Sequence, residues 1–132
     1  MEEIIEIHDS TLSKITYENK DLTLHFNPAY IIKSKGTILA DGGSGFNQNL
    51  TIALKDCIVE VSSIEPATDL WTGFSIIDGI KHDNYIPMPL IVEKEFKISI
   101  TGMTGGEFVA YANSAYIIEM GNPEFIEDIP KA

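Results

Sequence analysis

The chain has 132 residues, with 20 acidic and 9 basic side chains, which gives a formal net charge of −11 at pH 7. This length suits one domain, and we expect residues 1–132 to form a single unit. All nine basic residues are lysine, and the acidic excess argues against a nucleic-acid-binding surface, which needs basic side chains to displace phosphate counterions.

The first residues, the length of the apolar runs and the single cysteine indicate the cellular compartment. Acidic residues occupy the positions where a secretory signal carries positive charge, and no apolar run approaches the ~20 residues of a membrane-spanning helix. The single Cys57 suits a reducing compartment because it has no partner for an intramolecular disulfide. We therefore expect a cytoplasmic protein without a membrane partner.

Alternation of apolar and polar residues, with many β-branched side chains, predicts strands in the first half of the chain. Asn27-Pro28 interrupts one of them, so a bulge is expected before the strand continues. Residues 57–63 either continue the preceding strand around a bend or form its hairpin partner. The predicted strands cover residues 11–17, 22–26, 29–33, 37–40, 46–55 and 57–63.

The second half repeats this rhythm. Residues 65–69 are expected to form a loop or one helical turn, residues 80–90 an irregular crossing, and residues 124–129 an acidic tail. Strands are predicted at 71–77, 95–101, 107–112 and 115–120. About seven to nine short strands separated by Gly, Asn and Pro turns predict an all-β domain with little helix, either an antiparallel sandwich or an open barrel.

The segment Asp41-Gly42-Gly43-Ser44-Gly45 resembles a phosphate-binding loop in composition. Such a loop requires a following helix and a lysine, whereas this segment runs into a predicted strand. We therefore interpret it as a flexible connection between strands.

Two identical dipeptides, His8-Asp9 and His82-Asp83, contain two of the three histidines. Imidazole and carboxylate together can bind a divalent metal, or act as a base and the group that orients it. The alternative is structural, with Asp capping backbone amides beside a half-buried His. We favour the structural interpretation, and assign no catalytic residue, no metal ligand and no cofactor.

Aromatic residues offer a second kind of site. Trp71 and Tyr85 lie beside the least regular segments, where they could form part of a ligand-binding face. Packing and cross-strand pairing explain most aromatic residues on sheets, so this ligand-binding role remains an alternative.

Both ends of the chain carry a resemblance. The opening Ile7-His8-Asp9-Ser10-Thr11-Leu12, the strand at 22–26 and the closing Phe125-Ile126-Glu127-Asp128-Ile129 resemble small uncharacterised bacterial proteins. These proteins begin with a His-Asp-(Ala/Ser) element and end with an aromatic-aliphatic-Glu-(Asp/Glu) element. Some of them are similar to immunity proteins that neutralise polymorphic toxins.

The resemblance implies a layout without an activity, and it falls on His8, Asp9, Glu127 and Asp128. We expect these residues to bind a partner or to join the two ends of the chain, with His8 near the acidic tail. Seven of the 20 acidic residues lie within residues 2–9 and 124–128, so joined ends would concentrate negative charge.

Three functions follow as hypotheses. The first is a non-enzymatic interaction module, of the immunity type, whose acidic surface binds a protein with a basic surface. The alternative is a small-ligand or carbohydrate-binding module that uses Trp71 and Tyr85, and a metal-dependent enzyme ranks third. Predicted strand edges also allow a homo-oligomer.

Overall fold

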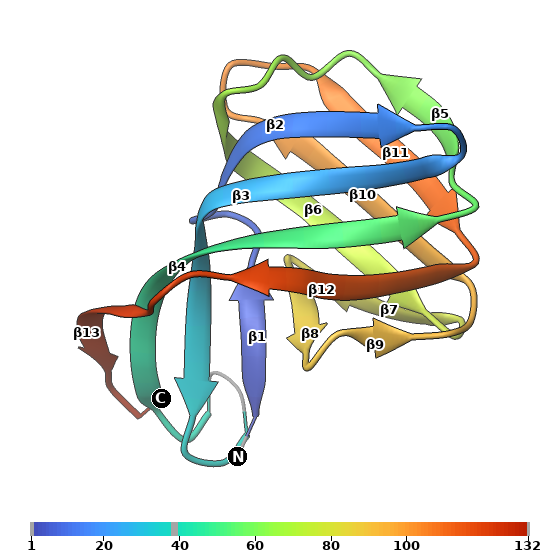
Figure 1. Ribbon diagram of the computed structural model, residues 1–132. Coiled ribbons are helices and arrows are strands. Elements are labelled where there is room, and N and C mark those ends of the chain that lie inside the picture. The colour runs from blue at the N-terminus through green and yellow to red at the C-terminus, as the bar shows by residue number, and fades with distance from the viewer. Residues whose placement is uncertain (1, 38–39, 132) are drawn as a thin grey trace.

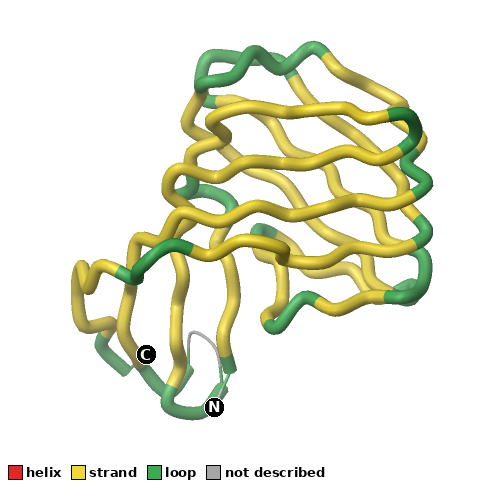
Figure 2. The backbone as a smooth tube through the Cα atoms, viewed as in Figure 1, coloured by secondary structure: helices red, strands yellow, loops and turns green. Residues whose placement is uncertain are grey.

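The computed structural model describes residues 2–37 and 40–131, and Figures 1 and 2 show a molecule built from strands and connecting turns. Within these residues there is no helix. The all-β prediction is confirmed. The strands are β1 (Glu3–Glu6), β2 (Thr11–Glu18), β3 (Asp21–Ser34), β4 (Gly43–Lys55), β5 (Ile58–Ser62), β6 (Thr68–Ile77), β7 (Ile80–Asp83), β8 (Tyr85–Met88), β9 (Ile91–Val92), β10 (Phe96–Gly102), β11 (Glu107–Ala112), β12 (Ser114–Met120) and β13 (Glu124–Ile129).

The strands form one open antiparallel sheet, with the order β5-β11-β10-β6-β2-β3-β4-β12-β9. Four further strands pair outside this path: β1 with β3 and β8, β7 with β6, and β13 with β4. Figure 1 shows β2, β3, β4 and β12 in front of β6, β10 and β11, so the sheet folds over itself. No helix in the described part of the chain is long and apolar enough to cross a membrane.

The main core fills the space between these front and back strands. Alternate side chains of each strand point into it because successive residues of a strand face opposite sides of the sheet. On β10, for example, Phe96, Ile98 and Ile100 are fully buried, whereas Lys97 and Ser99 between them are partly exposed. Leu24 and Phe26 of β3, with Leu50 and Ile52 of β4, contribute the facing side.

The hairpin of β3 and β4 organises the rest of the molecule. Its first half pairs Leu22–Phe26 with Leu50–Leu54, and its second half pairs Ala29–Ser34 with Gly43–Gln48. The register shifts between Phe26 and Ala29, so the bulge expected at Asn27-Pro28 is present and divides the hairpin. The two halves carry different neighbours: β2 and β12 flank the first, whereas β1 and β13 flank the second.

A second, smaller apolar cluster holds the far half together. Ile4, Tyr30 and Ile32 are buried there, and Tyr85 and Ile129 pack against them. The cluster therefore joins the first strand, the middle of the chain and the last strand.

The expected number of strands, about seven to nine, is wrong, because the structure has 13. Four of the additional strands are short: β1 in the acidic opening and β7, β8 and β9 within or beside the segment expected to be irregular. The acidic tail forms β13, which is exposed at every position from Glu124 to Asp128 and thus has no apolar period to reveal it.

Three local expectations also change. Strand β5 pairs with β11, so residues 57–63 neither continue β4 nor form its hairpin partner. Residues 68–69 belong to β6 instead of a loop. In the strand expected at 37–40, residues 38–39 lie outside the described part of the chain, and Thr37 and Ala40 lie in a bend and a turn.

Candidate functional site

The candidate functional sites are two surfaces, one on each half of the β3–β4 hairpin. We call the first the terminal lobe: β1, β13 and the far halves of β3 and β4, which cover residues 3–6, 29–34, 43–47 and 124–129. Figure 1 shows it as an extension below the main body of the sheet, with both chain ends in it.

The two ends of the chain are joined through Tyr30. Its hydroxyl donates a 2.7 Å hydrogen bond to Oε1 of Glu127 on β13, and its backbone pairs with Glu6 of β1. Between Tyr30 and β13 lies β4, where Gly45 leaves room for the ring: a Cβ at this position would overlap the Tyr30 hydroxyl. Gly43, Ser44 and Gly45 are part of the paired strand β4, so the interpretation of 41–45 as a flexible connection is wrong for these three residues, whereas Asp41 and Gly42 lie outside the strands.

Three carboxylates gather around this link. Burial, a hydrogen bond with Asp9 and the negative charges of Asp9 and Glu127 together raise the pKa of Glu6 to about 7, against the opposing effect of His8. Burial and the bond to Glu127 also raise the pKa of Tyr30, so its hydroxyl remains a donor at neutral pH. The Glu6 carboxyl is consequently partly protonated near neutral pH.

His8 lies beside this cluster but takes other partners. Its Nδ1 lies 2.7 Å from the carbonyl oxygen of Trp71, its backbone amide donates to Oδ1 of Asn84, and its ring meets the indole edge-on at 5.4 Å. Tyr30, not His8, provides the bond to the acidic tail. Asp128 is exposed and lies opposite Ser44 of β4.

The second His-Asp dipeptide is also engaged locally. His82 Nδ1 lies 3.1 Å from the hydroxyl of Tyr85, and Asp83 lies 3.5 Å from the ammonium of Lys81. Over residues 2–37 and 40–131, no group of three or more His, Cys, Asp or Glu side chains is arranged to hold a metal ion.

The outer surface of β13 combines apolar and acidic side chains. Phe125 and Ile126 are 56% and 42% exposed, and Glu124, Glu127 and Asp128 flank them. Phe125 rests edge-on against Phe46 of β4, with ring centroids 5.7 Å apart. Phe125 is thus supported on one side by Phe46, while much of its own surface and that of Ile126 faces solvent. Within the described residues, β13 pairs with β4 alone.

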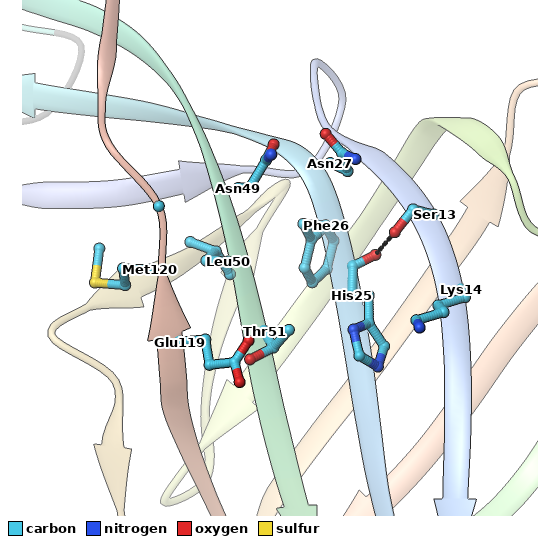
Figure 3. Close-up of a pocket in the computed structure, with 11 residues that line it drawn as sticks. Ser13, Lys14, His25, Phe26, Asn27, Asn49, Leu50, Thr51, Glu119 and Met120 are labelled. Carbon is cyan, nitrogen blue, oxygen red and sulfur yellow. Dashed lines mark hydrogen bonds between the residues drawn. The ribbon is translucent and has the colours of Figure 1, made fainter.

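The second surface, which we call the polar groove, lies on the near half of the hairpin. Strand pairing there aligns four side chains across four adjacent strands: Lys14 of β2, His25 of β3, Thr51 of β4 and Glu119 of β12. Because Leu24, Phe26, Leu50 and Ile52 face the core, His25 and Thr51 face the opposite side. Figure 3 shows the four side chains spread over these strands.

Two bulges put the charged members into this row. Leu12 pairs with Phe26, so regular pairing would set Ser13 opposite His25, but the register shift sets Lys14 there instead. On β12 a second shift replaces Ile118 by Glu119 opposite Thr51. The hydroxyl of the displaced Ser13 donates to the carbonyl oxygen of His25. A lysine thus ends the row on one side and a carboxylate on the other.

The imidazole in this row is predominantly neutral at pH 7. Burial lowers the pKa of His25, the charge of Lys14 lowers it further, and Glu119 acts in the opposite direction. Its Nε2 lies 3.1 Å from the hydroxyl of Thr16.

The row lines a cavity of about 620 Å³, and neither Trp71 nor Tyr85 lines it. Trp71 is instead an exposed residue beside His8, and Tyr85 packs against the small cluster of the terminal lobe. Sequence reasoning missed Glu6, Gly45, Thr51 and Glu119. The sequence indicated these sites only indirectly, because the alternation of apolar and polar residues breaks at Asn27-Pro28 and at Ile117-Ile118.

Comparison with known proteins adds no family: the chain matches no protein-family model, no curated protein and no solved structure. The two surfaces therefore have to be interpreted from their own geometry.

Proposed function

We propose that this protein is a non-enzymatic interaction module of the immunity type, which uses the terminal lobe to bind a protein with a basic surface. The observation that carries the proposal is the exposed pair Phe125 and Ile126, flanked by three carboxylates on a strand that, among residues 2–37 and 40–131, pairs on one side only. Interface centres favour aromatic side chains within a polar rim, and β13 has this arrangement.

The charge of the lobe indicates the chemistry of the partner. Glu124, Glu127 and Asp128 lie on the same strand as the apolar pair, and Glu6 and Asp9 lie next to Glu127. A basic partner gains from this charge in both approach and orientation, because complementary potentials speed association and disfavour wrong partners. The same two chain segments resemble small bacterial proteins, some of which are similar to immunity proteins, and this supports a toxin-like protein as the partner.

The cytoplasm is the compartment that we assign to this function. Cys57 is free and half-buried, and burial raises the pKa of its thiol, which makes it a poor nucleophile.

The direct experiment uses the product of the gene next to that of this protein. We expect it to be a toxin-like protein with a basic surface, and co-expression to protect cells from it. Calorimetry should show binding that weakens as salt increases, because surface charges are screened. Failure to bind and to protect would overturn the proposal.

Matched variants locate the interface. Replacing both Phe125 and Ile126 by alanine should weaken binding about a hundredfold, which corresponds to two exposed apolar anchors of roughly 1.4 kcal/mol each. Ile58→Ala is the control because Ile58 is 70% exposed on β5, a different part of the sheet. Equal effects of the two changes would remove β13 from the interface.

A further inference from the structure

The polar groove lies next to the terminal lobe, which it meets at Asn47 and Glu124, and it has the features of a small-molecule site. Its cavity of about 620 Å³ falls within the range that ligand pockets occupy. A second cavity, of about 380 Å³, shares Asn27, Asn49 and Gly121 with it. The two therefore form one continuous groove along the outer side of β3, β4 and β12.

Amide side chains dominate the shared part and the extension. Asn27 and Asn49 line both cavities, and Asn47 and Asn122 line the second. Each amide offers both hydrogen-bond donors and an acceptor without net charge. Such a lining matches a ligand whose own groups both donate and accept, which is the property of a hydroxyl.

The charges in the larger cavity balance. Lys14 and Glu119 end the cross-strand row on opposite sides, about three strand spacings or ~14 Å apart between Cα atoms. Neutral His25 lies between them. A single lysine does not attract a polyphosphate to a chain with a net charge of −11. Because the cavity carries one lysine and one carboxylate, it favours neither anions nor cations. The larger cavity thus favours an uncharged ligand, whereas the smaller cavity adds one carboxylate, that of Glu124 at the start of β13.

Thr51 supplies the decisive polar atom. Its side chain is 8% exposed, and its hydroxyl is the buried side-chain oxygen that has no hydrogen-bond partner among the described residues. Figure 3 places it beside Glu119 and between strands β3 and β12. An unpaired buried hydroxyl is destabilising, and few buried polar groups in native proteins lack a partner. A ligand hydroxyl that enters when the exposed Glu119 side chain rotates would pair with it.

An apolar surface completes the lining. Met120 is 50% exposed in the lining, whereas Phe26 and Leu50 are 2% exposed and direct their side chains into the core beneath it. A flexible thioether side chain adapts to an irregular apolar face. Sugar rings present such C–H faces next to their hydroxyl groups.

We propose that the groove binds an uncharged polyhydroxylated ligand, of the sugar or oligosaccharide class, through Thr51, Asn49 and the row that ends in Lys14 and Glu119. Thr51 and Asn49 donate to and accept from ligand hydroxyls, and Met120 covers a C–H face of the ring.

The test is an NMR titration of the ¹⁵N-labelled protein with neutral hexoses, N-acetylhexosamines and their oligosaccharides. Amino acids and inorganic phosphate form the comparison arms. We expect saturable shifts at the amides of His25, Asn49 and Thr51 with at least one saccharide. No saturable shift there with any saccharide would overturn the proposal, and saturation by an amino acid or phosphate alone would overturn the ligand class.

Two substitutions with matched controls sharpen the result. Asn49→Ala should weaken saccharide binding about tenfold, as expected for the loss of a hydrogen-bonding amide, whereas Asn113→Ala should leave it unchanged. Both asparagines are exposed, but Asn113 lies at a different cavity. Equal affinities of wild type and Asn49→Ala would contradict the placement of the ligand.

Thr51→Val should change thermal stability and saccharide binding in opposite directions. It should raise the melting temperature of the free protein, because an unpaired buried hydroxyl is removed, and at the same time weaken saccharide binding about tenfold. Thr101→Val, on β10 in another part of the sheet, should change neither. An unchanged melting temperature together with unchanged binding would show that the Thr51 hydroxyl has no role in a site.

Discussion

The two halves of the β3–β4 hairpin share their strands but differ in charge and in neighbours. The far half is flanked by β1 and β13, which bring Glu6 and Glu127 together and expose Phe125. The near half is flanked by β2 and β12, which bring one lysine and one glutamate to opposite ends of a row.

The difference shows that the net charge of −11 does not describe the whole surface. One bulge, at Asn27-Pro28, separates an acidic, partly apolar lobe from an electrically balanced groove. We assign the first to a basic protein and the second to an uncharged ligand. The variants below test whether the two halves are as independent as their contacts indicate.

Gly45→Ala should have the largest effect. The added Cβ overlaps Tyr30, so the ring must move and its bond to Glu127 is lost, at a cost of about 2–4 kcal/mol in the free energy of unfolding. Urea denaturation measures this loss, and hydrogen exchange should increase in β13 before it increases in β12.

Gly121→Ala is the matched control. The atom nearest to a Cβ there is the carbonyl oxygen of Asn49, at 3.5 Å, so we expect a change below about 0.5 kcal/mol. Equal destabilisation by the two alanines would mean that Gly45 has no special role in joining the chain ends.

Glu6→Gln should remove a pH dependence. The pKa of Glu6 is about 7 in the folded protein against an ordinary value of 4.5, so folding favours the protonated carboxyl. Its contribution to stability is fully present below pH 4.5 and is lost as the pH rises through 7. Allowing for screening at a half-buried side chain, we expect the wild type to lose about 1–2 kcal/mol between pH 5 and pH 8.

The glutamine variant should show a flatter stability profile and exceed the wild type at pH 8, as measured by urea denaturation at several pH values. Glu60→Gln, at an exposed position of β5, should retain the wild-type slope. A slope that survives in Glu6→Gln would place the titrating group elsewhere.

Tyr30→Phe should have a smaller effect, of about 1 kcal/mol, because it removes one hydrogen bond to a carboxylate that is accessible to water. A double-mutant cycle with Glu127→Ala should give a coupling energy of similar size. Tyr116→Phe, on β12, should show no coupling to Glu127→Ala. The absence of coupling between Tyr30 and Glu127 would separate the two chain ends energetically.

The smallest expected effect is a pair of opposite shifts in the pKa of His25, in the polar groove. Lys14→Gln should raise the pKa of His25 and Glu119→Gln should lower it, because the two charges act on the imidazole in opposite directions. NMR titration of the His25 ring measures both shifts. Shifts in the same direction would contradict a balanced row.

Strands with one buried face were predictable from the sequence. Residues 22–26 and 96–101 alternate clearly because every second side chain enters the core, and the break at Asn27-Pro28 marks the bulge that divides the hairpin. A strand without a buried face has no such period. All residues of β13 from Glu124 to Asp128 are exposed, and only pairing with β4 makes this segment a strand.

The sites were harder to predict because they depend on pairing between distant segments. Tyr30 and Glu127 lie 97 residues apart, and Gly45 between them resembled a flexible linker when only its neighbours in sequence were considered. The polar groove depends on one-residue register shifts in β2 and β12, which alternation alone does not locate. His8 and Asp9 were prominent in the sequence, whereas Glu6, two residues before His8, occupies the centre of the acidic cluster.

One NMR experiment tests the separation of the two surfaces most directly. The labelled protein is titrated first with a short oligolysine peptide, as a probe for a basic partner, and then with the saccharide that binds best. The account predicts two separate sets of shifts, the first around Glu6 and residues 124–128 and the second around Asn49 and Thr51, with neither ligand displacing the other. A common set of shifts, or displacement of one ligand by the other, would contradict it.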